Sequence, residues 1–68
     1  MVIVLKTNIL SQLETHVRAM LDSFKQIVTV DFDFEDVDKS LRIEASEDLT
    51  SDIELLLNSK GFYCKELT

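Results

Sequence analysis

Residues 28–34 read VTVDFDF and residues 41–45 read LRIEA, and these two runs decide the fold of the chain. In both runs, apolar residues alternate with polar ones, which is the pattern of a β-strand with one face buried and the other in water. Residues 35–39 between the runs are mostly polar and are typical of a turn. The middle of the chain is therefore predicted to be a β-hairpin.

An amphipathic helix is predicted before this hairpin. Its apolar residues recur every three or four positions and would form one buried stripe, made of Leu10, Leu13, Val17, Met20, Leu21 and Phe24. Ser11 and Glu14 have the spacing of a capping box, in which each side chain accepts a hydrogen bond from the other residue's backbone N–H. This spacing places the start of the helix near Gln12.

A second helix is predicted after the hairpin. Its buried stripe would consist of Ile53, Leu56 and Leu57. Ser51 and Glu54 repeat the spacing of a capping box at its start. Gly61, the only glycine in the chain, lies where a residue in the left-handed conformation commonly ends a helix.

The first and the last strand of the chain complete the pattern. Residues 2–7 form an apolar, β-branched run, which is typical of a central strand covered on both faces. Residues 62–67 form a short alternating strand. The resulting βαββαβ order predicts a ferredoxin-like α+β fold, with a four-stranded antiparallel sheet and both helices on one face. Right-handed crossovers favour the strand order 4-1-3-2, which places the acidic second strand at an edge.

Length and composition narrow the class of protein. The 68 residues leave room for a single domain spanning residues 1–68. A net charge of −6 argues against binding to nucleic acid, because such binding relies on basic side chains that neutralise phosphates. The apolar runs are too short to span a membrane, and no signal peptide is recognisable. With one cysteine, the chain is expected in a reducing compartment, which favours a cytoplasmic location.

The sequence lacks the residues that several known functions of this fold require. An RNA-recognition domain needs stacking aromatics on its two central strands, but the return strand of the hairpin has none. An acylphosphatase-like enzyme needs an arginine in an anion-binding loop, and the first loop has none. No nucleophile–base set is recognisable, so we expect no enzymatic activity. A calcium-binding loop that starts at Asp31 would need a glycine at its sixth position and a glutamate at its twelfth. These positions are Asp36 and Arg42, so a calcium site is not expected.

Four segments occur in order along the chain, and their order and spacing resemble a known family. They are KTNI at residues 6–9, Val17 with Leu21, IVTVDF at residues 27–32, and Gly61 with Phe62. With these segments, the whole chain resembles a heavy-metal-associated domain, the fold of small copper chaperones and of the N-terminal modules of metal-transporting ATPases. The resemblance implies the ferredoxin-like fold.

The metal-binding motif of that family is missing from this sequence. In the family, the loop after the first strand carries Met-x-Cys-x-x-Cys, whose two thiolates bind a soft ion such as Cu(I). Counting back from the first helix places the two cysteines at Leu10 and Leu13, whereas counting forward from residues 6–9 places them nearer Ser11 and Glu14. None of these positions is a cysteine. We therefore expect no bound metal and no cofactor.

Cys64 and His16 are the remaining candidates for a soft metal ion. Cys64 alternates in register with Phe62, so both side chains are expected to face the helices, and the thiol is expected to be a small core residue. His16 lies beside the apolar stripe of the first helix and is expected at the surface. Neither has recognisable partner ligands in the sequence.

Three hypotheses for the function remain open. The first is a protein-contact module that binds a protein partner or a second copy of itself, through strand edges or through an apolar patch of Leu10, Leu13 and Phe62, unless these leucines are core residues. The second is a metal carrier with one Cys64 thiol from each subunit of a dimer. The third is an ACT-like domain that binds a small regulatory ligand, although that family favours a glycine in the first loop.

Overall fold

A computed structural model describes residues 1–67 of the chain. Its elements follow one another in the predicted order. The strands are β1 (Val2–Thr7), β2 (Ile27–Asp33), β3 (Ser40–Ala45) and β4 (Cys64–Glu66), and the helices are α1 (Glu14–Leu21) and α2 (Thr50–Ser59), with a short 3₁₀ helix η1 (Ser11–Leu13) before α1. Within residues 1–67, no helix is both long and apolar enough to cross a membrane.

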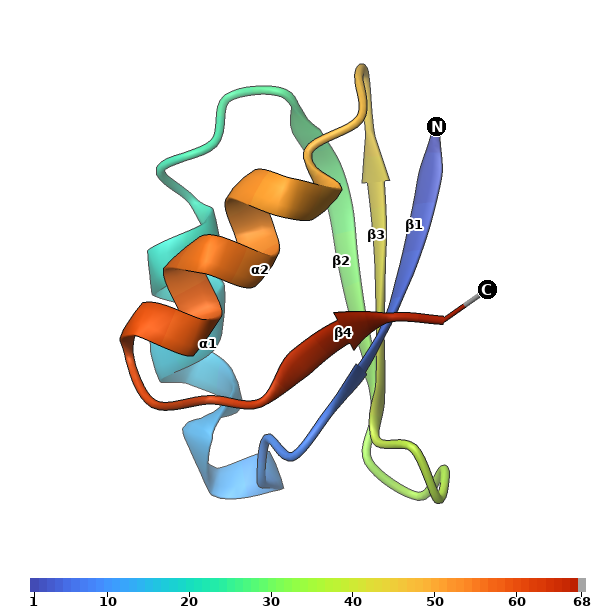
Figure 1. Ribbon diagram of the computed structural model, residues 1–68, viewed down its shortest axis with the longest axis vertical. Helices are drawn as coiled ribbons and strands as arrows, with labels where there is room; N and C mark the ends of the chain where they lie inside the picture. The colour runs from blue at the N-terminus through green and yellow to red at the C-terminus, as the bar shows by residue number, and fades with distance from the viewer. Residues whose placement is uncertain (68) are drawn as a thin grey trace.

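The four strands form one antiparallel sheet in the order β2-β3-β1-β4. This is the predicted order read from the opposite edge. Figure 1 shows both helices on one face of the sheet, while the other face is left uncovered. The core lies between the helices and the sheet. It is made of Ile3, Leu5, Ile9, Val17, Leu21, Leu41, Ile43, Ala45, Leu49, Ile53, Leu57 and Cys64.

The central strand β1 is covered on one face only, so the prediction of two covered faces is wrong. Ile3 and Leu5 point to the helices and are almost completely buried, whereas Val2 on the other face is 48% exposed. Val4 is partly buried and Lys6 is exposed. Strand β1 has a central position in the sheet, as its apolar run indicates. Both helices lie on the same face of the sheet, so this position leaves the other face of the strand uncovered (Figure 1).

The hairpin of β2 and β3 is confirmed, with one difference in β2. A shift in register between Ile27 and Thr29 places an extra residue, Val28, in the strand, as in a β-bulge. Val28 is therefore 64% exposed, and Ile27 packs against the core instead. The prediction that Val28 faces the core is wrong because an uninterrupted alternation ignores this bulge.

The capping box predicted at the start of the first helix does not form. The segment begins as the 3₁₀ helix η1, and no side chain caps it. The hydroxyl of Thr7 accepts a hydrogen bond from the N–H of Ile9 at 3.2 Å, two residues before η1. The carboxylate of Glu14 accepts a 2.8 Å bond from the Arg18 side chain, so it is not placed on the backbone N–H of Ser11.

At the start of α2, Asp48 takes the role that was predicted for Ser51. The Asp48 carboxylate accepts hydrogen bonds from the backbone N–H of Thr50 at 3.0 Å and from its hydroxyl at 2.6 Å. At the other end of α2, Gly61 has a φ of 90°, in the left-handed region. The end of the helix at Gly61 is thus confirmed.

Strand β4 is shorter than the predicted strand of residues 62–67, and α2 covers its outer edge. The backbone N–H of Glu66 donates a 2.7 Å hydrogen bond to the carboxylate of Glu54. The backbone carbonyl of Cys64 accepts a 3.4 Å bond from the side chain of Asn58. Because these backbone groups already have partners, the β4 edge is a poor template for an added strand.

Candidate functional site

The connection between β1 and α1 is held in place by both of its neighbouring segments. The backbone N–H and the side-chain carbonyl of Asn8 bond the backbone of Tyr63 at 3.4 Å and 2.9 Å. The hydroxyl of Thr7 donates a 2.7 Å hydrogen bond to the carbonyl of Lys39 in the hairpin turn. The connection therefore has a defined shape that links β4 to the β2–β3 turn.

Within this connection, Ile9 and not Leu10 points into the core. Ile9 is fully buried, and Leu13 and Val17 follow it at intervals of four residues on the inner side of the helical segment. Leu10 is 49% exposed, so its assignment to the buried stripe is wrong. The sequence did offer a signal for Ile9, because an inward stripe that starts there keeps the same helical spacing.

The three residues of the predicted apolar patch differ in exposure. Leu10 is the most exposed of them, whereas Leu13 and Phe62 are partly buried and pack against the core. Phe62 lies next to Tyr63, which the Asn8 bonds attach to the β1–α1 connection. Tyr63 is 47% exposed and adds apolar surface that the sequence alone did not suggest.

The donor atoms at the connection do not suit a soft metal ion. Leucines and a serine occupy positions 10, 11 and 13, and Glu14 is engaged by Arg18. A soft ion such as Cu(I) prefers thiolate or thioether ligands, and none of these side chains carries sulfur. Among residues 1–67, no three His, Cys, Asp or Glu side chains lie close enough together to hold an ion.

Cys64 lies in the core, and its environment opposes ionisation. The residue is only 4% exposed. Burial, with a smaller contribution from the negative charge of Glu54, raises the pKa of the Cys64 thiol from 9.0 to about 12. A metal ligand needs the thiolate form, so this environment is unfavourable for metal binding. His16 is exposed on α1.

The acidic residues around the hairpin turn stabilise the turn itself. The carboxylate of Asp36 accepts a short hydrogen bond from the hydroxyl of Ser40, which lowers the pKa of Asp36 below 3.8. The carboxylate of Asp33 accepts a 3.2 Å bond from the N–H of Asp36. Asp38 forms an ion pair with Lys6 at 3.6 Å. These carboxylates thus support the turn rather than converge on a calcium site.

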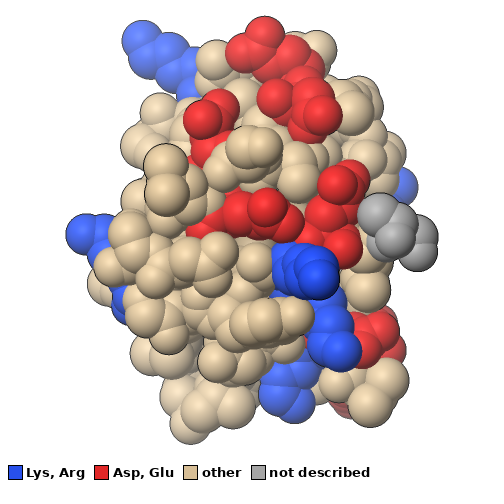
Figure 2. All heavy atoms as spheres, in the orientation of Figure 1, with Lys and Arg blue, Asp and Glu red and all other residues tan. Residues whose placement is uncertain are grey.

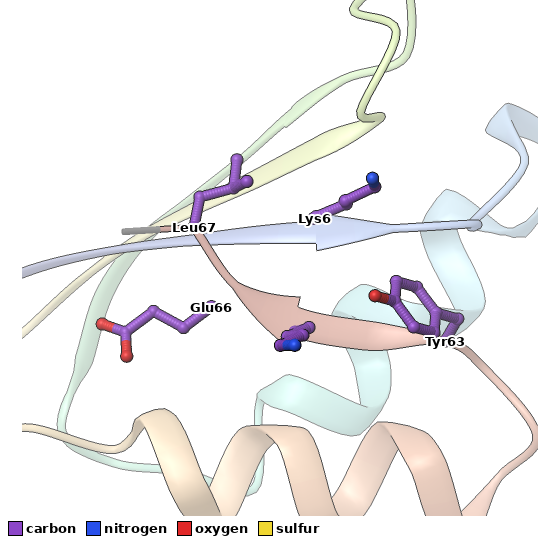
Figure 3. Close-up of a pocket in the computed structure, with 5 residues that line it drawn as sticks. Lys6, Tyr63, Glu66 and Leu67 are labelled. Carbon is purple, nitrogen blue, oxygen red and sulfur yellow. The ribbon is translucent and has the colours of Figure 1, made fainter.

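A shallow pocket of about 270 Å³ lies beside β4 and was not predicted. Its lining consists of Lys6, Tyr63, Lys65, Glu66 and Leu67. In Figure 3, the side chains of Lys6 and Leu67 rise from the side of the sheet that faces away from α2. Figure 2 shows basic side chains grouped around β4, next to a band of acidic ones. Lys6 and Lys65 are cross-strand partners, so strand pairing brings these two charges together.

The chain has the fold of two solved domains, although no protein-family model and no curated protein matches its sequence. The N-terminal domain of ZntA in its apo form superposes with a TM-score of 0.81 at 14% identity, over 98% of this chain and 92% of that domain. The yeast copper transporter domain Ccc2a, solved in apo and Cu(I)-loaded states, gives 0.77 at 18% identity, over 98% and 94%. This chain therefore has the fold of the heavy-metal-associated domains, as its sequence predicts.

Proposed function

We propose that this chain is a non-catalytic domain with the heavy-metal-associated fold that acts through contact with proteins and does not transfer metal ions. The observation that carries the proposal is the chemistry of the β1–α1 connection. Its side chains offer no sulfur ligand, and the one thiol of the chain lies in the core with a raised pKa. Hydrogen bonds from Thr7 and Asn8 nevertheless hold the connection in place, so its shape does not depend on a metal ion.

The surface proposed for contact is the apolar patch around the β1–α1 connection, made of Leu10, Leu13 and Phe62. Leu10 supplies most of its exposed area. The strand edges are less suitable for contact, because α2 covers β4 while a bulge and two aspartates protect β2. We further propose that residues 1–68 act as one domain in the cytoplasm.

Equilibrium dialysis against Cu(I) and against Zn(II) tests the part of this proposal that concerns metal ions. We expect no stoichiometric uptake of either ion by the reduced protein in the presence of a competing chelator. The Cys64→Ser variant is the control and should give the same result as the unmodified chain. Tight uptake of one ion per chain would overturn the proposal.

The same experiment separates this function from that of a metal carrier with a shared site. A carrier that uses one thiol from each of two chains would take up one ion per two chains. It would also lose that uptake completely in the Cys64→Ser variant. Such a pair of results would establish the carrier function in place of the contact function.

A further inference from the structure

The uncovered face of the sheet carries an ordered distribution of charge. Strand pairing aligns four residues in one row across the sheet, from one edge to the other: Asp33, Ser40, Lys6 and Lys65. The acidic end of this row belongs to β2, and its basic end belongs to β1 and β4. On β2, Asp31 lies on the same face as Asp33, one row away. Between the edges, β3 adds Arg42 directly beside Asp31 and Glu44 one row further on, so the opposite charges at the two edges are clearest in the row of Asp33 and Lys65.

Apolar side chains lie in the same face between and beside these charges. Val2 is 48% exposed and Leu67 is 37% exposed, while Val4 is partly buried between them. The backbone N–H of Leu67 donates a 2.9 Å hydrogen bond to the carbonyl of Val4, which keeps these two residues side by side. An exposed apolar strip on β1 and β4, with lysines at one end of it and aspartates on the opposite edge of the sheet, is suited to a partner that offers apolar surface and the reverse order of edge charges.

We propose that the partner of this face is a second copy of the same chain, packed sheet against sheet around a two-fold axis that runs along the strands. Such an axis places β2 of each copy over β4 of the other, because rotation about it exchanges the two edges of the face. It keeps each row in place along the strands, so Asp33 would lie over the partner's Lys65. Two-fold symmetry forms this pairing twice, and the face is therefore complementary to itself. The inference goes beyond the proposed function, since it concerns a surface other than the Leu10 patch.

The pocket beside β4 supplies a place for the incoming carboxylate. Lys6, Lys65 and Tyr63 line it together with Glu66 and Leu67. Lys6 already pairs with Asp38, whereas Lys65 takes part in no ion pair within the described part of the chain. A carboxylate from the other copy would give Lys65 a partner and would enter a site that already carries positive charge.

The area of the uncovered face limits the affinity that is expected for the dimer. Four strands at a spacing of about 4.8 Å and a length of about 20 Å give roughly 400 Å² of sheet per copy. Stable complexes bury about 800 Å² per partner, so the dimer should be weak and should form only at high concentration. Added salt screens both the attraction within the charged pairs at the rim and the repulsion between two chains of charge −6, so reversal of single charges, and not salt, is the test of these pairs.

Analytical ultracentrifugation of the full chain tests this dimer. At about 0.15 M salt, which screens the net repulsion between chains, the average mass should rise from 7.8 kDa towards twice that value as the concentration increases from about 0.05 to about 1 mM. Asp33→Lys and Lys65→Glu should each weaken association about tenfold or more, because each places like charges against each other. The double variant restores the opposite charges in reversed order and should regain association.

Two variants with matched changes of charge serve as controls. Asp22→Lys and Lys25→Glu alter exposed residues just after α1, away from the sheet face, and should leave association unchanged. Circular dichroism would show that all variants keep the fold. NMR shifts that depend on concentration should map to Val2, Arg42 and Lys65.

Three outcomes would overturn the dimer. The first is a monomer throughout the concentration range, and the second is a double variant that fails to recover association. The third is a set of concentration-dependent shifts at Leu10 and Phe62, which would assign self-association to the other patch. None of these outcomes affects the test of metal binding, so the two proposals fail independently.

Discussion

At the scale of single residues, the side on which Ile9 and Leu10 lie determines what the first connection can do. Both residues are apolar, and either could begin a stripe with helical spacing. The structure selects Ile9 for the core because the hydroxyl of Thr7 holds the N–H of Ile9 at the turn. Sequence periodicity alone could not separate the two, since it contains no information on how the chain enters the helix.

Replacement of these two residues by alanine should therefore have very different effects. Ile9→Ala should lower the free energy of unfolding by about 2–5 kcal/mol, because it leaves a cavity in the core. Leu10→Ala should change it by less than about 0.5 kcal/mol, as is usual for exposed positions. Urea denaturation followed by circular dichroism measures both values. Equal losses would show that Leu10 is a core residue after all.

The thiol of Cys64 should react slowly in the folded protein. A pKa of about 12 instead of 9.0 leaves about a thousandfold less thiolate at neutral pH, and burial further hinders access. Labelling with a chromogenic disulfide reagent should be slow in buffer and complete within minutes in about 6 M urea. Glu54→Gln removes a charge that raises this pKa and should increase the rate in buffer. Fast labelling of the native chain would contradict the core position of Cys64.

At the scale of elements, the helices were predictable and the caps at their N-termini were not. Hydrophobic spacing identifies both helices, because each must bury one face on the sheet. The caps depend on where each side chain finds a hydrogen-bond partner. The carboxylate of Glu14 accepts a hydrogen bond from Arg18. At the second helix, the carboxylate of Asp48, and not the hydroxyl of Ser51, accepts a hydrogen bond from a backbone N–H, that of Thr50. A Ser–x–x–Glu spacing marks the region of a helix start, but competing partners determine the capping residue.

The cap at Asp48 should make the stability of α2 depend on pH. The hydrogen bonds from Thr50 lower the pKa of Asp48 below its ordinary value of 3.8. A lowered carboxyl pKa in the folded state stabilises the fold fully above the unfolded pKa, and this contribution is lost as the pH falls through the folded pKa. Asp48→Asn keeps an acceptor oxygen and should remove this part of the acid dependence.

Thermal unfolding from pH 6 to about pH 2.5 measures the effect of this cap. The difference in Tm between the unmodified chain and Asp48→Asn should shrink as the pH falls below 3.8. Comparison of the two chains cancels the contribution of Asp36, which titrates in the same range. Asp48→Ala should lower the Tm at pH 6, whereas Ser51→Ala should not. A lower Tm for Ser51→Ala but not for Asp48→Ala would show that Ser51 is the capping residue.

Substitution of Gly61 tests the role of its backbone conformation at the end of the same helix. No heavy atom lies within 4 Å of the position where a Cβ would be, so the only cost of a side chain is the backbone conformation at a φ of 90°. Gly61→Ala should therefore lower the free energy of unfolding by about 1–2 kcal/mol. Gly61→Asn should lose less, because asparagine tolerates positive φ. Equal losses in chemical denaturation would indicate that something other than backbone strain is responsible.

At the scale of the whole molecule, the strand order followed from patterning and handedness, whereas the functional surfaces did not. Alternating runs, helical stripes and right-handed crossovers leave few arrangements for a chain of this length. The row from Asp33 to Lys65 joins residues that are 32 positions apart in sequence, and only the pairing of four strands aligns them. Sequence spacing could therefore not predict the charge distribution of the uncovered face.

The net charge of the molecule should make its fold more stable as salt is added. A charge of −6 on a body of 27 × 23 × 19 Å repels itself, and only two ion pairs are present within residues 1–67. The Debye length is about 30 Å at 0.01 M salt and about 8 Å at 0.15 M, so added salt should screen this repulsion across the molecule. At about 10 µM protein, where a weak dimer is dissociated, the Tm should rise by about 2–8 °C over that range of salt. A Tm that falls with salt at low concentration would mean that attractive pairs, and not the net charge, dominate the electrostatics of the fold.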